Sequence, residues 1–206
     1  MNRLLLHPLA RPACWLLLAS PALGLLALAL GDGLGPNPAE ALIRQLGDWT
    51  LRALCLTLAI TPLRQALGWT ALARFRRAAG VATFAYGSLH WLAYAWLDQG
   101  LDLHALWTDV AKRPFILVGT AAWLTMVPLA ATSVDAAVRR LGGAAWRRLH
   151  RLCYLLAPLA LLHFWWMRAG KNNLAEVGVY TLLLAGLLLW RVRPRGRRAP
   201  PPQAEM

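Results

Sequence analysis

Charged residues are scarce in this chain, and acidic residues are scarcer than basic ones. Only 15% of the 206 residues are charged, whereas 58% are hydrophobic, and Asp and Glu together number 9. A soluble domain typically carries about 25% charged residues. The shortage excludes an ordinary water-soluble globule and favours a chain whose main solvent is lipid.

Paired cysteines and several catalytic motifs are also missing. Membrane thiol oxidoreductases need two cysteines that exchange a disulfide, but Cys14, Cys55 and Cys153 are isolated on separate segments. The chain has no Gly-x-Ser-x-Gly elbow and no His-Glu-x-x-His helix, so a hydrolase or metalloprotease has no visible nucleophile or zinc pair.

What the chain does have is a series of apolar segments separated by short polar stretches. This pattern predicts an all-α polytopic membrane protein in which about six transmembrane helices form one bundle over residues 1–190. A basic, Pro-rich cytoplasmic tail over residues 191–206 is expected to be disordered. The predicted spans are residues 13–31, 50–63, 78–97, 115–132, 149–167 and 174–190.

The cations are divided unevenly between the two sides of this bundle. When the polar stretches are assigned alternately to each side, 16 of the 22 Lys and Arg residues fall on one side. They are Arg3, Arg11, Arg64, Arg74, Arg76, Arg77, Arg139, Arg140, Arg147, Arg148, Arg151, Arg191, Arg193, Arg195, Arg197 and Arg198. Because cytoplasmic loops are rich in Lys and Arg, the sequence predicts an inner-membrane protein with both termini in the cytoplasm. Cations spread over several loops do not form one basic surface, so lipid rather than nucleic acid is the predicted partner.

Three further segments have specific predictions. The apolar stretch from Cys14 to Leu30 follows two basic residues, Arg3 and Arg11, and has Ala27-Leu28-Ala29 near its end. This pattern also fits a secretory signal with a small-residue cleavage site, so a cleaved signal is an alternative to a retained span. A short external helix is predicted over residues 39–46, ahead of the second span. Apolar residues recur at helical spacing between residues 98 and 114, which predicts a short amphipathic helix at the external interface. They are Leu103, Leu106, Trp107 and Val110.

Histidines are the remaining candidates for chemistry. His7 and His104 fall in solvated polar stretches, whereas His90 and His163 lie deep in the third and fifth spans, where ionisable side chains are costly and usually functional. At 1.5 Å per residue their depths are about 18 and 21 Å, which is nearly level. Two neutral imidazoles facing each other at one depth can supply both axial ligands of a haem iron. A hydrogen-bonded packing role is the alternative for each.

His150 lies at the cytoplasmic start of the fifth span, about 20 Å from His163 along a helix. At 100° per residue the two side chains differ by about 220°, so they share a face only if the helix is rewound or bent, and Pro158 is the candidate cause. The third span offers no histidine level with His150, only Arg74-Phe75-Arg76-Arg77. A haem at this level would have one histidine ligand, would have another kind of ligand, or would be absent.

Six separated motifs occur in the order found in a known family, over roughly residues 35–170. The chain thereby resembles the MsrQ family, also called YedZ, within the ferric-reductase-like transmembrane group. The motifs are Gly35-Pro36-Asn37-Pro38-Ala39-Glu40; Leu58-Ala59-Ile60-Thr61-Pro62-Leu63-Arg64; Arg76-Arg77 with Leu89-His90; Lys112-Arg113-Pro114-Phe115-Ile116 with Gly119; Pro128-Leu129-Ala130 with Thr132-Ser133; and Trp146-Arg147-Arg148-Leu149-His150-Arg151-Leu152-Cys153-Tyr154 followed by His163.

The resemblance implies a transmembrane electron-transfer subunit rather than a catalytic one. Such a subunit passes electrons from the quinone pool through b-type haem to MsrP, a periplasmic molybdenum-cofactor reductase that repairs methionine sulfoxide in proteins, and the two form a heterodimer. FMN is also implied, as is a cytoplasmic flavin reductase as an alternative donor. Carried over residue by residue, the resemblance nominates His90, His150 and His163 as the haem-iron ligand set, for one haem b or two.

Two other classes of function stay open on the sequence. One is a non-redox membrane scaffold or small transporter in which the histidines pack or relay protons. The other is a self-sufficient haem reductase or oxidase of a small external acceptor. The second is disfavoured because no Gly-x-Gly-x-x-Gly motif follows the last span, so NAD(P)H has no visible binding domain.

Overall fold

The structure is a computed structural model that describes residues 1–169 and 174–192. All the regular elements in these two ranges are helices, as the composition predicts. In chain order they are α1 (Asn2–Leu6), α2 (Ala10–Leu30), α3 (Pro38–Ala66), η1 (Thr70–Phe75), α4 (Arg76–Ala93), η2 (Tyr94–Asp98), α5 (Leu103–Lys112), α6 (Pro114–Ala131), α7 (Asp135–Leu149), η3 (His150–Leu152), α8 (Cys153–Ala169) and α9 (Leu174–Val192).

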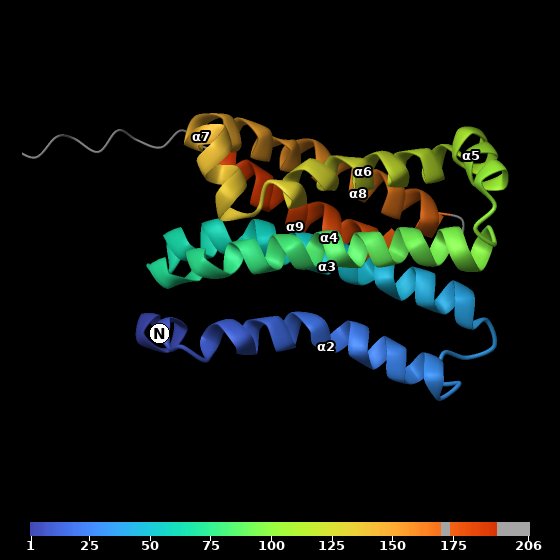
Figure 1. Ribbon diagram of the computed structural model, residues 1–206, viewed down its shortest axis with the longest axis horizontal. Coiled ribbons are helices and arrows are strands. Elements are labelled where there is room, and N and C mark those ends of the chain that lie inside the picture. The colour runs from blue at the N-terminus through green and yellow to red at the C-terminus, as the bar shows by residue number, and fades with distance from the viewer. Residues whose placement is uncertain (170–173, 193–206) are drawn as a thin grey trace, which may run out of the picture.

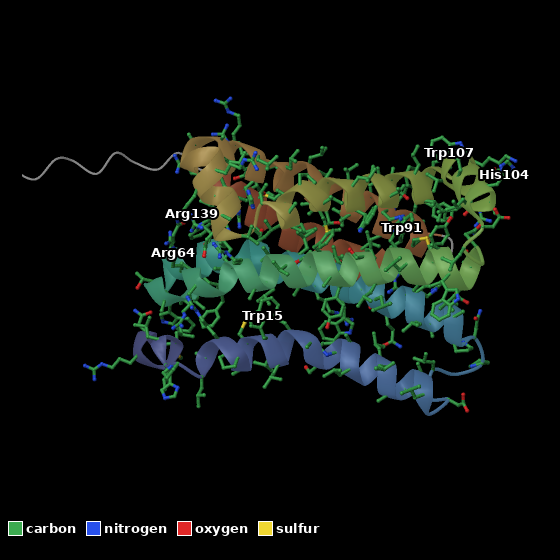
Figure 2. All side chains as sticks on the ribbon, in the orientation of Figure 1. Trp15, Arg64, Trp91, His104, Trp107 and Arg139 are labelled. Carbon is green, nitrogen blue, oxygen red and sulfur yellow. The ribbon has the colours of Figure 1, made fainter. Side chains whose placement is uncertain are left out.

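The long helices α2, α3, α4, α6, α8 and α9 lie side by side along the long axis of the molecule (Figure 1). The N-terminus and α7 lie at one end of this bundle, and α5 lies at the other. Figure 2 places Arg64 and Arg139 at the first end, and His104 and Trp107 at the second. The two ends therefore match the two sides that the charge pattern separates.

Within the described ranges, four stretches of helix are long and apolar enough to cross a membrane: Ala10–Leu30, Pro114–Ala131, Asp135–Ala169 and Leu174–Arg191. Many of their large apolar side chains are exposed, such as Leu17 at 73% and Leu182 at 76%, as expected for surfaces that face lipid. The all-α, multi-pass membrane architecture is thus confirmed. The count of six spans stays a prediction, because α3 and α4 lie within the bundle but carry more polar residues.

Small residues allow α3 and α4 to pack closely. The face of α4 toward the bundle contains Ala79, Ala82 and Gly87, which are all buried. Across this contact the hydroxyls of Thr57 and Thr83 lie 3.2 Å apart. Small side chains let helix backbones approach each other in a membrane, where packing and hydrogen bonds replace the hydrophobic drive.

Tyr86 fixes α2 against α4. Pro21 interrupts the hydrogen-bond ladder of α2, since proline has no N–H and its ring crowds the preceding turn. The Tyr86 hydroxyl enters this gap, donating to the Leu18 carbonyl at 2.7 Å and accepting from the Ala22 N–H at 3.2 Å. The segment for which a cleaved signal was the alternative is therefore hydrogen-bonded to the bundle in this structure.

The second predicted span differs from the observed helix. Residues 39–46 and 50–63 form a single helix, α3, instead of an external helix followed by a span. Asn37 caps it by accepting a hydrogen bond from the Glu40 N–H, and Pro38 occupies the first turn, where its missing N–H costs nothing. Neither proline nor a left-handed glycine interrupts residues 39–61, so the helix continues.

The fifth predicted span also differs. His150 lies in the 3₁₀ segment η3, which follows α7 directly and leads into α8 at Cys153, so the helical winding changes between His150 and His163. Pro158 lies inside α8, and the bend expected there stays a prediction. Of the predicted tail, residues 193–206 lie outside the described residues, and Arg191 belongs to α9.

Candidate functional site

A cavity of about 360 Å³ lies among α3, α4, α6 and α8, toward the α5 end of the bundle. His90 on α4 and His163 on α8 both line it. The centroids of the two imidazoles are 6.1 Å apart, with an angle of 68° between the ring planes. The predicted proximity of these two residues is therefore confirmed, from helices that are not adjacent in the chain.

Each of the two histidines is held by a hydrogen bond from its Nδ1 to a backbone carbonyl of a neighbouring helix. Nδ1 of His90 lies 2.8 Å from the carbonyl oxygen of Ile43, and Nδ1 of His163 lies 2.7 Å from that of Phe115. A carbonyl can only accept, so each Nδ1 carries a proton. In the neutral ring this leaves the lone pair on Nε2, and the hydrogen bond at Nδ1 then fixes the tautomer in which Nε2 can act as a metal ligand.

A glycine beside each histidine provides the space for its ring. A Cβ at Gly47 would lie 3.1 Å from Cε1 of His90, and one at Gly119 would lie 2.8 Å from Cε1 of His163. Gly47 and Gly119 each lie four residues after the residue whose carbonyl accepts the Nδ1 proton, so one helix face supplies both features. The two halves of the site are therefore built alike.

The separation of the two rings fits one metal ion between them. When each nitrogen is about 2 Å from the metal, the centroids of two opposed imidazoles lie about 6 Å apart. Within residues 1–169 and 174–192, no group of three or more His, Cys, Asp or Glu side chains gathers as a metal site. Two imidazoles facing across an apolar cavity suit the two axial positions of a porphyrin iron, whose remaining four ligands are the porphyrin's own.

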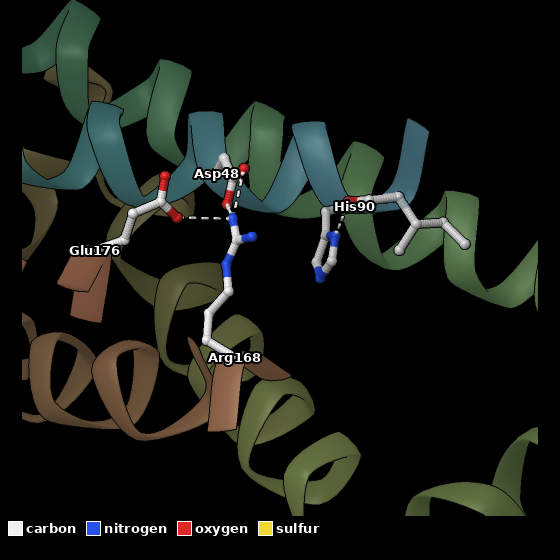
Figure 3. A network of polar contacts seen from close by, with 5 residues as sticks. Asp48, His90, Arg168 and Glu176 are labelled. Carbon is white, nitrogen blue, oxygen red and sulfur yellow. Dashed lines mark hydrogen bonds and ion pairs between the residues drawn. The ribbon is translucent and has the colours of Figure 1, made fainter. Parts of the chain in front are cut away.

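An ion-pair network closes the outer rim of this cavity. The Arg168 guanidinium on α8 donates to both carboxylate oxygens of Asp48 on α3 at 3.1 Å, and it pairs with Glu176 on α9 at 3.1 Å. Figure 3 shows the Arg168 guanidinium bound to both Asp48 and Glu176, with the His90 ring to one side of it and hydrogen-bonded elsewhere. The network joins the half of the site that holds His90 to the half that holds His163.

A second cavity, of about 270 Å³, lies toward the other end of the bundle and is lined by His150. The His150 ring stacks on Trp146 with 3.8 Å between centroids, and its Nδ1 lies 3.1 Å from the Trp146 carbonyl oxygen. Among the described residues that line this cavity, there is no second histidine. Its cationic lining residues are Arg76, Arg77 and Arg191.

Only a thin layer of side chains separates the two cavities. Four residues line both of them, namely Leu54, Thr83, Met126 and Leu156. All four are buried, and Met126 is 6% exposed. The two cavities therefore follow one another through the bundle, one toward each end.

Sequence reasoning located the three histidines but not the groups that orient them. The structure brings His90 and His163 together and leaves His150 in a separate cavity. It adds Gly47, Gly119 and the Arg168 network, none of which the sequence analysis singled out as functional. One signal in the sequence could have located these groups: Gly47 follows Ile43, and Gly119 follows Phe115, at the same spacing of four residues.

Comparison with known proteins places this geometry in a described family. Residues 46–161 match the family model described as "Ferric reductase like transmembrane component". A relative from Polaromonas naphthalenivorans is 53% identical over 188 residues, covering 91% of this chain and 86% of the relative. Relatives from Ralstonia nicotianae and Bordetella pertussis are 51% and 52% identical, covering 88% and 83% of this chain and 84% and 82% of themselves. All three are named "Protein-methionine-sulfoxide reductase heme-binding subunit MsrQ". No solved structure matches.

Proposed function

Because the chain belongs to the MsrQ family of ferric-reductase-like transmembrane proteins, we propose that it is the haem-binding electron-transfer subunit of a protein-methionine-sulfoxide reductase system. The observation that carries this proposal is the pair of neutral, level imidazoles of His90 and His163, 6.1 Å apart across an apolar cavity. A bound haem b would supply one-electron chemistry by alternating between ferric and ferrous iron.

The residues of the chain support this use in three ways. Gly47 and Gly119 leave room for the two rings, and the carbonyls of Ile43 and Phe115 fix their tautomers. Apolar side chains keep water from the iron, which helps to set its potential. The Asp48–Arg168 pair ties the two halves together at the rim.

We further propose the direction of electron flow. Electrons enter from the quinone pool at the cytoplasmic end, pass His150 and the second cavity, and reach the haem between His90 and His163. They leave at the α5 end to a periplasmic, MsrP-like molybdenum-cofactor reductase that forms a heterodimer with this chain. The support is the order of the two cavities along the bundle and the excess of cations in the segments at the His150 end, which the positive-inside rule assigns to the cytoplasm.

Other parts of the proposal rest on the family resemblance alone. They are a haem at His150, an FMN, and a cytoplasmic flavin reductase as an alternative donor. The second cavity offers His150 as one ligand, and its arginines suit an anionic group. No residue is assigned to FMN.

Absorption spectra of the purified full chain, oxidised and reduced, test the central proposal. We expect a six-coordinate low-spin b-type spectrum, followed by fast reoxidation of the haem only when the periplasmic reductase and its methionine-sulfoxide substrate are present. A protein without porphyrin would favour the scaffold alternative. Equally fast reoxidation by a small external acceptor without the partner would favour a self-sufficient reductase.

A further inference from the structure

Two buried N–H donors on the wall of the His90–His163 cavity have no acceptor among the residues that the structure describes. They are Nε of Arg44, on α3, and Nε1 of Trp91, on α4. Figure 2 shows Trp91 between α4 and α6, and its ring stacks on Trp123 with 5.0 Å between centroids. A buried donor without a partner costs free energy comparable to a lost hydrogen bond, so these two atoms point to an acceptor that belongs in the cavity.

A second arginine repeats the placement of Arg44 on the other half of the site. Arg44 directly follows Ile43, whose carbonyl holds His90, and Arg113 lies two residues before Phe115, whose carbonyl holds His163. Both arginines are among the residues that line the cavity. The site therefore has one arginine beside the backbone anchor of each histidine.

Both arginines are already oriented by a carboxylate one helical turn away. Arg44 pairs with Glu40 at 2.6 Å, and Arg113 pairs with Asp109 at 2.7 Å. A guanidinium has five N–H donors, and one ion pair leaves several of them for another acceptor. Because α3 begins at Pro38 and Arg113 lies between α5 and α6, both arginines mark the α5 end of the cavity.

We propose that Arg44 and Arg113, with the indole N–H of Trp91, form a binding site for the two propionate carboxylates of the haem. This inference rests on the proposed function, since it assumes a haem between His90 and His163. A b-type haem has two carboxylates on one edge and an otherwise apolar periphery, and arginine is well suited to bind carboxylates. The site turns the carboxylate edge toward the α5 end, and it leaves the apolar edge toward the partition of Leu54, Met126 and Leu156.

Titration of the full chain, prepared without haem in detergent, with hemin and with hemin dimethyl ester tests this site. The ester has the same ring and iron but no charged carboxylates. We expect the wild-type chain to bind hemin at least about tenfold more tightly than the ester, because charge-assisted hydrogen bonds to buried donors are lost with the ester. The readout is the low-spin absorption band during each titration.

Substitutions show which residues cause the tighter binding of hemin than of its dimethyl ester. The double variant Arg44→Gln with Arg113→Gln should bind the ester as the wild type does, while its preference for hemin disappears. Trp91→Phe, which keeps an aromatic ring and removes only the N–H, should reduce the preference in part. Arg52→Gln is the matched control, because Arg52 also lies on α3 but is exposed over Trp49 and does not line the cavity.

The outcomes separate this inference from the proposed function. If the wild type binds both compounds equally with low-spin spectra, or if the double variant keeps its full preference, the propionate site is wrong and the proposed function stands. If neither compound gives a six-coordinate low-spin spectrum in the wild type, the proposed function itself fails. Binding of the ester also shows directly whether each variant still forms the cavity.

Discussion

The imidazole of His163 occupies the space that a side chain at Gly119 would need. A Cβ at position 119 would lie 2.8 Å from both Cε1 and Nδ1 of the ring, closer than real Cβ atoms approach a neighbour. The same ring is held by the Phe115 carbonyl one turn earlier on α6. The absence of a side chain at Gly119 is thus part of how the histidine is positioned.

Replacing this glycine should disturb the site more than its small size suggests. Gly119→Ala forces the ring or α6 to move, and overpacking of this kind destabilises by about 1–3 kcal/mol. We expect a lower unfolding temperature and reduced haem occupancy. The control is Gly186→Ala on α9, where a Cβ meets nothing within 4 Å and a helix gains about 0.5–1 kcal/mol. Equal effects of the two substitutions would contradict this role of Gly119.

The two facing histidines should behave as one ligand pair. His90→Ala and His163→Ala each remove one axial bond, which leaves an iron that is five-coordinate or exchanges ligands, so the low-spin spectrum should disappear in both variants. His104→Ala, on the exposed start of α5, is the matched control and should keep the wild-type spectrum. Retention of a full low-spin spectrum by both His90 and His163 variants would rule out this pairing.

Much of this architecture follows from periodic features of the sequence, and the remainder depends on contacts that sequence periodicity does not encode. Apolar runs and depth along a helix placed His90 and His163 at one level, because rise per residue is constant in a helix. The position of the 3₁₀ segment at His150 was not predicted, because the run from Trp146 to Tyr154 contains neither proline nor glycine, yet η3 forms there between α7 and α8. The pairing of Arg168 with Asp48 depends on how α3 and α8 pack against each other, and the sequence of either helix alone does not reveal that packing.

The Asp48–Arg168 pair should stabilise the haem site. Both side chains are mostly buried, at 23% and 18% exposed, so Asp48→Asn weakens a charged hydrogen bond that is worth about 1.5–3 kcal/mol. We expect faster loss of haem from the purified variant and a lower unfolding temperature. Asp135→Asn removes a carboxylate that is 69% exposed in its pair with Arg77, and exposed pairs contribute little. A variant at Asp48 that retains haem as well as the Asp135 control would count against this role.

The topology can be measured with reporter fusions. The sequence assigns 16 of the 22 cations to one side, so a reporter fused after Arg198 should be active only in the cytoplasm. One inserted near Asp102, at the start of α5, should be active only in the periplasm. The reverse pattern would place the His90–His163 cavity nearer the cytoplasm and overturn the proposed direction of electron flow.

Docking of the periplasmic reductase is best tested at Asp98, because two neighbouring carboxylates have structural roles. Asp109 accepts from the Tyr94 hydroxyl and pairs with Arg113, so its replacement would disturb the cavity wall. Asp102 caps α5: hydrogen bonds from the backbone N–H groups of Ala105 and His104 hold the pKa of its carboxyl below the usual value. Asp98 is exposed at the edge of the His90–His163 cavity, where Gln99 donates a 3.4 Å hydrogen bond to it.

Charge reversal at Asp98 should slow electron delivery without removing haem. If the partner is guided by the acidic α5 end, Asp98→Lys lowers the rate of association, and the rate at low salt falls more than the rate at high salt. The measurement is the rate of haem reoxidation by the periplasmic reductase with its methionine-sulfoxide substrate, at several ionic strengths. Asp135→Lys, at the opposite end of the bundle, should leave this rate unchanged. A rate that is independent of salt and of the charge at position 98 would mean that docking relies on apolar contacts, for which the exposed Leu103 and Trp107 on α5 are the available surface.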